Sequence, residues 1–463
     1  MEKFNKSYIL GISMVSAMGG LLFGYDWVVI GGAKPFYERF FDIAGLPALQ
    51  AWAMSSALVG CIIGAIFSGL ISDKFGRKKP LMLAAVLFTI SALGSGLVSQ
   101  FDLFVISRII GGIGIGLASA LSPMYIAEVA PAKMRGGFVS LNQFTIVIGI
   151  LAAQIINMLI AEDVPLDASD TFIRESWNGQ MGWRWMFLAE LVPAFSFFGM
   201  IFLVPESPRW LMKAGKEVKA FPTLKKIGGD KYAREEMANI RATLNDVSEK
   251  IDFKSLLNPK FRTVLVIGIV LAVFQQWCGI NTVFNYADEI FTAAGYGVSD
   301  MLFNIVITGT VNLIFTLVAM FTVDKWGRKK LMLLGSIGLG ITYLLLGSAF
   351  YFQLKGVAVL SLVVIAIAIY AMSLAPITWV ILSEIFPNRI RGAAMALATF
   401  ALWVACFILT YTFPLLNATF GAAGTFWVYA VICLFGFVFI AYKLPETKGK
   451  SLEEIEKEMT PKP

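Results

Sequence analysis

Uncharged apolar segments about as long as a membrane-spanning helix recur along the whole chain. Clear examples are Leu81–Gln100, Val139–Ile160, Val264–Ile280 and Gly424–Ala441. A helix needs about 20 mostly apolar residues to cross the hydrocarbon core of a bilayer. Only 15% of the residues are charged, whereas soluble domains carry about 25%. The sequence therefore predicts an all-α integral membrane protein.

Basic residues are concentrated in alternate loops between these segments. They occur in Lys74–Lys79, Lys133–Arg135, Lys213–Arg262, Lys325–Lys330, Arg389–Arg391 and Lys448–Lys450. The intervening loops carry few charges or are acidic, as in Glu162–Asp170. Because cytoplasmic loops carry the excess of lysine and arginine, both termini are expected in the cytoplasm. Topology thus explains the net charge of +7, and no nucleic-acid partner is expected.

The residue types needed for enzymatic or metal chemistry are not grouped in this chain. Four cysteines (Cys61, Cys278, Cys406 and Cys433) lie in apolar segments at unrelated spacings, and histidine is absent. No nucleophile–base, metal-ligand or disulfide pattern is formed. We expect no enzyme activity, no cofactor and no metal site. A proton-carrying group within the membrane must then be a carboxylate or something less usual.

Three sequence landmarks occur in each half of the chain, in the same order. Asp73–Lys79 returns as Asp324–Lys330, Glu128–Gly136 as Glu384–Gly392, and Pro205–Arg209 is echoed by Pro445–Lys448. All fall on the predicted cytoplasmic side. Two halves of parallel topology are therefore expected, related by an axis along the membrane normal.

Twelve spans are predicted, six in each half. They cover roughly 8–30, 52–72, 80–99, 102–127, 138–160, 183–204, 263–290, 301–323, 330–351, 357–383, 393–414 and 424–442. The expected units are an N-terminal half (1–206), a cytoplasmic linker with short helices (207–260), and a C-terminal half with a short tail (261–463). The glycine-rich stretches Gly111–Gly116 and Gly335–Gly340 lie inside spans without a preceding strand, which favours close helix packing over nucleotide binding.

These landmarks resemble those of the sugar porter family of the major facilitator superfamily, over essentially the whole chain. The chain resembles in particular the bacterial proton-coupled pentose and hexose symporters, and it is also similar to the mammalian facilitative glucose carriers. The resemblance implies the major facilitator fold, a monosaccharide and a proton as substrates, and a monomer in the lipid bilayer. The short loops suggest a bacterial cytoplasmic (inner) membrane.

Charged side chains within spans are candidates for function, because charge at membrane depth is costly. Asp26 in the first span and Arg108 in the fourth come to similar depth, since these spans run in opposite directions. We predict that they pair. The pair either fixes two helices or holds a carboxylate that alternates between arginine-paired and protonated forms. Glu190 in the sixth span is a second coupling candidate, or a group that hydrogen-bonds between helices.

A sugar site needs amides, which both donate and accept, and an aromatic face. The seventh span offers Gln275, Gln276 and Asn281. A helix break near Gly279 is expected to make these amides converge, and discontinuous helices are where transporter sites form. The alternative is hydrogen bonding between helices.

The resemblance implies further substrate contacts along the chain. They are Phe23, Gln143, Asn285, Asn312, Trp379 and Trp403, with Trp379 as the surface against which the sugar packs. Xylose-type members carry glutamines in place of Ile150 and Leu402, a tyrosine in place of Asn285 and a glycine in place of Ala375. These differences leave the identity of the sugar open.

Acidic residues end two spans beside arginines in the landmarks. Ion pairs across the halves are expected to hold a cytoplasmic gate shut, formed by Arg77, Glu128, Arg135, Arg328, Glu384 and Arg391. The alternative is that these charges only set topology. The predicted function is import of a hexose or pentose with a proton by alternating access. A proton-independent sugar carrier and a membrane sugar sensor that does not transport are the alternatives.

Overall fold

The computed structural model describes residues 4–166, 168–246, 259–387, 390–450 and 452–459. Within these ranges the chain forms helices and no strand, so the predicted all-α class is confirmed. Eleven of the described helices are long and apolar enough to cross a membrane. The longest, α18 (Arg391–Lys443), contains Gly421 with non-helical angles (φ 67°, ψ 175°), so it consists of two successive helices. The described helices thus supply the twelve predicted spans.

The spans follow one another as two groups of six. The first group is α1 (Lys6–Phe40), α2 (Pro47–Phe75), α3 (Lys78–Leu97), α4 (Phe101–Val129), α5 (Arg135–Ile160), and η2, α7 and α8 (Asn178–Gly182, Trp183–Leu188 and Leu191–Ile201), with the short α6 (Asp170–Glu175) before η2. The second group is α11 (Pro259–Trp277), α12 (Ile280–Asn285), α13 (Ala287–Ala293), α14 (Val298–Trp326), α15 (Arg328–Tyr351), α16 (Val357–Met372), α17 (Leu374–Ile385) and α18.

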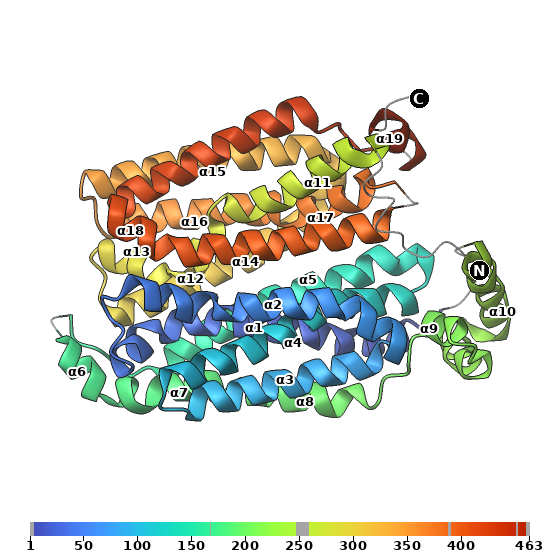
Figure 1. Ribbon diagram of the computed structural model, residues 1–463, viewed down its shortest axis with the longest axis horizontal. Helices are drawn as coiled ribbons and strands as arrows, with labels where there is room; N and C mark the ends of the chain where they lie inside the picture. The colour runs from blue at the N-terminus through green and yellow to red at the C-terminus, as the bar shows by residue number, and fades with distance from the viewer. Residues whose placement is uncertain (1–3, 167, 247–258, 388–389, 451, 460–463) are drawn as a thin grey trace.

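The two groups form two layers that lie side by side (Figure 1). They contact each other where α2 meets α18, where α5 meets α14, and where α1 meets α12 and α13. Both termini lie at one end of the molecule, together with α9 (Pro208–Lys213), α10 (Glu217–Asp246) and α19 (Leu452–Met459). We call this the terminal end; α6 marks the opposite, distal end.

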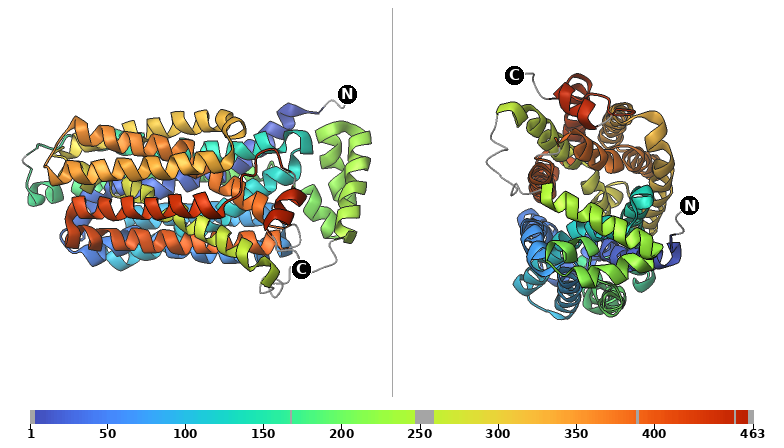
Figure 2. Two further views of the ribbon diagram at one scale, coloured as in Figure 1. Left: turned by 90° about the horizontal axis from the view of Figure 1, so that it is seen from above. Right: turned by 90° about the vertical axis from the view of Figure 1, so that its right-hand side faces the viewer.

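The predicted linker is only partly described. Figure 2 shows α10 across the terminal end. The described part of the predicted linker contains α9 and α10, whereas residues 247–258 lie outside the described ranges.

Glycines allow α2 and α4 to approach closely. A β-carbon on Gly60 would lie 2.9 Å from the carbonyl carbon of Gly112, and one on Gly116 would lie 2.8 Å from the α-carbon of Gly64. Real β-carbons do not come so near, so each position needs a residue without a side chain. The interpretation of Gly111–Gly116 as a helix-packing stretch is confirmed.

The seventh span is discontinuous, as predicted. Gly279 separates α11 from α12 and adopts the left-handed conformation with φ 89°. A β-carbon there would lie 2.8 Å from the ring of Tyr429, so glycine is favoured both by its backbone and by the space available. A second break, at Ser373 between α16 and α17, was not predicted. Pro376 in the first turn of α17 lacks the N–H that a continuous helix would need.

The α2–α4 contact predicts that Gly60→Ala destabilises the protein. Overpacking a close helix contact costs about 1–3 kcal/mol. The thermal unfolding midpoint in detergent should therefore fall. Gly69→Ala on the same helix is the matched control, because a β-carbon at Gly69 has open space around it. Equal midpoints for the two variants would contradict the packing argument.

Candidate functional site

The predicted pair of Asp26 and Arg108 forms between α1 and α4. Arg108 donates from Nη1 to Oδ1 of Asp26 and from Nη2 to the Asp26 carbonyl oxygen at 2.9 Å. The two residues are 0% and 1% exposed. Gly111, one turn after Arg108, leaves room for the carboxylate, because a β-carbon there would lie 3.0 Å from Asp26 Oδ2.

Glu190 completes a cluster of two acids and one base. It lies in the turn between α7 and α8, is 0% exposed, and has Asp26 and Arg108 as its charged neighbours. Among the described residues, no donor reaches either oxygen of Glu190 or Oδ2 of Asp26. Two buried carboxylates served by one guanidinium carry an excess negative charge, which a bound proton would neutralise.

The amides of the seventh span converge, as predicted. Gln276 donates to Oε1 of Gln275 at 2.5 Å, and Asn281 donates from Nδ2 to Oε1 of Gln276. Gln275 in turn donates to the hydroxyl of Tyr370 on α16 at 2.7 Å. The break at Gly279 makes this possible, because Gln276 and Asn281 would point apart on a continuous helix. The break thereby brings three amide side chains together in the second half.

Aromatic rings connect the two halves beside these amides. The ring of Trp403 on α18 lies 6.0 Å from that of Phe23 and 6.0 Å from that of Trp27, both on α1. Asn281 of the amide cluster also contacts Cys406, one turn along α18 from Trp403, with its Nδ2 3.7 Å from Sγ. Phe23 and Trp403, two of the predicted substrate contacts, therefore lie against each other, and their contact with a sugar stays a prediction. The sequence analysis did not name Trp27 as a candidate contact, although its spacing of four residues from Phe23 puts both on one helix face.

The remaining predicted contact residues are placed less closely together. Asn285 is buried and lines a small cavity that Trp27 and Arg108 also line. Asn312 on α14 is buried, Gln143 on α5 is half-buried, and Trp379 on α17 is 37% exposed. No hydrogen bond between described residues joins Gln143, Asn312 or Trp379 to the amide cluster.

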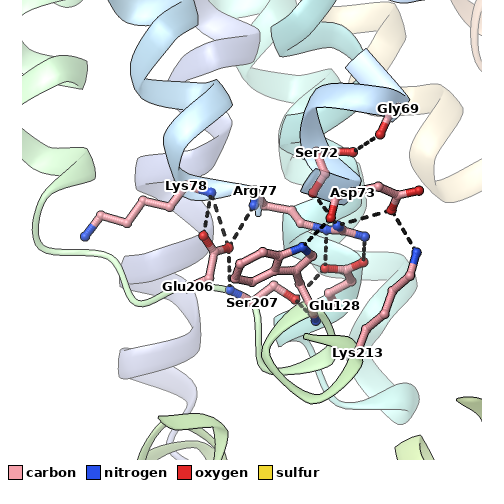
Figure 3. Close-up of polar contacts among 10 residues, drawn as sticks. Gly69, Ser72, Asp73, Arg77, Lys78, Glu128, Glu206, Ser207 and Lys213 are labelled. Carbon is pink, nitrogen blue, oxygen red and sulfur yellow. Dashed lines mark hydrogen bonds and ion pairs between the residues drawn. The ribbon is translucent and has the colours of Figure 1, made fainter. Parts of the chain in front are cut away.

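A charged cluster at the terminal end ties α2, α3 and α4 to the chain before α9 (Figure 3). Arg77 donates from Nε and Nη2 to the two oxygens of Glu128 at 2.9 and 2.8 Å. Glu206 accepts hydrogen bonds from the backbone N–H of Arg77 at 2.8 Å and of Ser207 at 2.9 Å. The hydroxyl of Ser207 donates to Glu128 at 2.5 Å.

The second half repeats this arrangement. Arg328 donates from Nη2 to Glu384 at 3.3 Å, and Glu446 accepts from the backbone N–H of Arg328 at 2.9 Å. Burial acts against the charged form of Glu446, but backbone N–H groups of Lys448, Arg328 and Thr447 outweigh it and lower the pKa of this carboxyl. Glu206 and Glu446 thus occupy equivalent places at the N-termini of α3 and α15. The sequence analysis gave Glu206 and Glu446 no role. Their equivalent positions could have been found from the repeated Pro-Glu-Ser and Pro-Glu-Thr segments.

The glycine of the Asp-x-x-Gly-Arg landmark has a structural reason in both halves. Gly76 and Gly327 have φ 89°, and a β-carbon on either would collide with the carboxylate of Glu206 or Glu446, respectively. A residue with a side chain would strain the backbone and displace the helix cap.

The ion pairs shown for the expected gate residues differ from the predicted pattern. Arg77–Glu128 lies within the first half and Arg328–Glu384 within the second, whereas pairs across the halves were expected. Arg391 donates from Nε to the Phe386 carbonyl oxygen at 3.0 Å, also within its half, and Arg135 is exposed. In this arrangement these ion pairs tie helices together inside each half.

Two six-helix halves, a buried carboxylate–arginine cluster in one and a broken polar helix in the other define a multi-pass membrane transporter. The family model described as "Sugar (and other) transporter" matches residues 12–459. The chain therefore belongs to the sugar transporter family of the major facilitator superfamily.

Similar proteins support this assignment over the full length. The arabinose-proton symporter of Bacillus subtilis is 42% identical over 97% of this chain and 95% of its own. The D-xylose-proton symporter of Escherichia coli is 42% identical over 98% of this chain and 96% of its own. The structure matches the inward-open conformation of the E. coli xylose transporter XylE with a TM-score of 0.85 and 40% identity, covering 98% and 100% of the chains. XylE bound to 6-bromo-6-deoxy-D-glucose gives a TM-score of 0.79 at the same identity and coverages.

The Arg77 cluster predicts that Glu128→Gln destabilises the protein. The substitution leaves the nearly buried Arg77 guanidinium with only the half-exposed Asp73, 3.8 Å away, as a counter-charge, and breaking the buried pair costs about 3 kcal/mol. Lys213→Gln is the control, because its ion pair with Asp73 is about half exposed and contributes less than about 1 kcal/mol. Thermal unfolding in detergent compares the two. A larger loss for Lys213→Gln would show that the cluster does not stabilise the terminal end.

Proposed function

We propose that this protein imports a monosaccharide together with a proton by alternating access. The observation that carries the proposal is the proximity of two different kinds of site. A buried group able to bind a proton lies in the first half, and an amide and aromatic site suited to a sugar lies in the second. The aromatic contact of Phe23 and Trp27 with Trp403 joins the two halves between these sites. The sugar–proton symport named for the Bacillus and E. coli relatives supports the same function.

The Asp26–Arg108–Glu190 cluster is the proposed coupling site. Two ionised carboxylates and one guanidinium leave one uncompensated negative charge in a buried site. Protonation of either carboxylate removes that charge. When a carboxylate stays paired with Arg108 it favours the charged form, and when it is separated it favours the neutral form. A change of state that alters this pairing would load the proton on one side and release it on the other.

Gln275, Gln276 and Asn281 are the proposed hydrogen-bonding groups for the sugar. They now satisfy one another, and a sugar hydroxyl would replace these mutual bonds with its own. Phe23, Trp379 and Trp403 offer ring faces for the apolar side of the sugar. Gln143, Asn285 and Asn312 are the remaining proposed contacts. A pentose or hexose fits this chemistry, in line with the arabinose and D-xylose named for the relatives.

The terminal end is proposed to face the cytoplasm, because it carries the basic loops. Contacts between the halves at the distal end include the hydrogen bonds of Lys34 to Asp288 and Glu289, and the fold is more similar to the inward-open relative than to the sugar-bound one. Both observations support a state open toward the cytoplasm. In the opposite state, Arg77, Glu128, Arg135, Arg328, Glu384 and Arg391 are proposed to bring the two terminal-end clusters together as the cytoplasmic gate. We propose a monomer in a bacterial inner membrane.

Asp26→Asn should abolish accumulation against a gradient while leaving sugar binding largely intact, because asparagine mimics the protonated acid permanently. Proteoliposomes with an imposed proton gradient and labelled D-xylose, L-arabinose or D-glucose provide the measurement. Asp102→Asn is the control, since Asp102 is exposed at the start of α4. Concentrative uptake by the Asp26 variant would move the coupling role to Glu190. A parent protein that only equilibrates sugar would identify a proton-independent carrier, and binding without any uptake would identify a sensor.

Gln276→Ala and Asn281→Ala should each weaken sugar binding by about 1–3 kcal/mol, because a sugar hydroxyl would lose its partner. Isothermal titration calorimetry on the purified protein measures this. Gln100→Ala, an exposed glutamine before α4, should leave the affinity unchanged. Parent-like affinity in both amide variants would place the sugar elsewhere.

A further inference from the structure

A second buried charge cluster lies at the distal end, away from Asp26 and Arg108. Lys34 and Glu38 belong to α1 in the first half, and Asp288 and Glu289 belong to α13 in the second. The side chain of Lys34 is 1% exposed, and its ammonium lies 2.9 Å from Asp288, 2.7 Å from Glu289 and 3.5 Å from Glu38. It also lies 5.3 Å from the centre of the Tyr286 ring. One buried cation therefore connects the two halves.

The cluster has three carboxylates for this single ammonium. Glu289 is the best served, because its second oxygen accepts from Nδ2 of Asn417 at 3.1 Å and the side chain is 22% exposed. Asp288 uses one oxygen on Lys34, and its Oδ1 has no donor among the described residues. Two uncompensated carboxylates in a buried site repel each other and are costly to keep ionised.

Glu38 is the carboxyl least able to stay charged. Its Oε2 accepts from Nε2 of Gln50 on α2 at 2.7 Å, but its Oε1 has no donor and lies 3.5 Å from Lys34, outside good hydrogen-bond distance. The other ionisable groups that face Glu38 are Lys34 and Tyr37 on its own helix, and Asp288, Glu289 and Tyr286 in the second half. The Tyr37 hydroxyl is directed to the sulfur of Met54, and Arg108 on α4 lies beyond it. A proton on Glu38 would remove this poorly compensated charge.

We propose that Lys34, Glu38, Asp288 and Glu289 form a proton-binding lock that closes the distal end, with the proton on Glu38. In the closed state, protonated Glu38 leaves Lys34 to hold Asp288 and Glu289 of the other half. When the halves separate, water reaches the carboxylates and the proton is released. The closed state therefore binds the proton more tightly than the open state, so acidic solution favours closure and rising pH favours opening. Only the placement of this lock within a transport cycle rests on the proposed function.

Distances between spin labels test the lock without sugar or transport. Ala48→Cys on α2 and Ala293→Cys on α13 put labels on exposed positions of the two halves at the distal end. The four native cysteines are buried and should not be labelled. Electron paramagnetic resonance on the full-length protein from pH 5 to 9 should show a short distance at low pH and a growing long-distance population as the pH rises. Because the readout needs no substrate, it is independent of whether the protein transports sugar.

Variants separate the lock from general instability. Lys34→Met should raise the open-to-closed ratio by about tenfold or more, since three acids then face one another without a cation. Glu38→Gln keeps the Gln50 contact and should stay closed at every pH, and it remains informative if Lys34→Met fails to fold. Arg39→Gln, whose pair with Asp170 joins two elements of the same half, is the control and should behave like the parent. An unchanged distance distribution in Lys34→Met would overturn the lock. A pH dependence that survives Glu38→Gln would overturn its proton site.

Discussion

The cost of burying charge away from water is the constraint on which this structure depends. Within a bilayer no solvent can compensate an ion, so each buried charge needs a partner from another helix. Arg108 finds Asp26, and Lys34 finds acids from both halves. Each cluster nevertheless contains more carboxylates than cations. Such an excess leaves a negative charge that a bound proton would remove.

The internal repeat supplies a symmetric framework, and function is placed on it asymmetrically. Both halves use a glycine with positive φ, an arginine and a glutamate from a later loop to fix the start of a helix: Gly76, Arg77 and Glu206 in the first half, and Gly327, Arg328 and Glu446 in the second. The interior of the halves differs. The Asp26–Arg108–Glu190 cluster lies in the first half, and the amide cluster of Gln275, Gln276 and Asn281 lies on a broken helix in the second.

Much of this arrangement was predictable because it follows from local or pairwise rules. Asp26 and Arg108 could be matched because each charge is costly to bury alone at the same depth, and each compensates the other. The break at Gly279 could be anticipated because three amides could converge only on an interrupted helix. The break at Ser373 and the role of Trp27 were missed, since neither residue type stands out in an apolar span. The gate prediction concerned pairs across the halves when the cytoplasmic gate is closed. In this structure Arg77 and Arg328 pair within their halves, so the closed gate stays a prediction.

The sequence by itself determined the number of spans, the doubled architecture, the close helix packing along Gly111–Gly116, and the need for the Asp26–Arg108 pair. These follow from apolar length, repetition, side-chain size and the cost of a lone charge, which act along the chain or between neighbouring helices. Only the tertiary structure decided which side chains of the two halves contact one another, as Lys34 contacts Asp288 and Glu289. Those contacts depend on how two rigid halves are oriented, and that orientation is set by packing over the whole interface rather than by any segment.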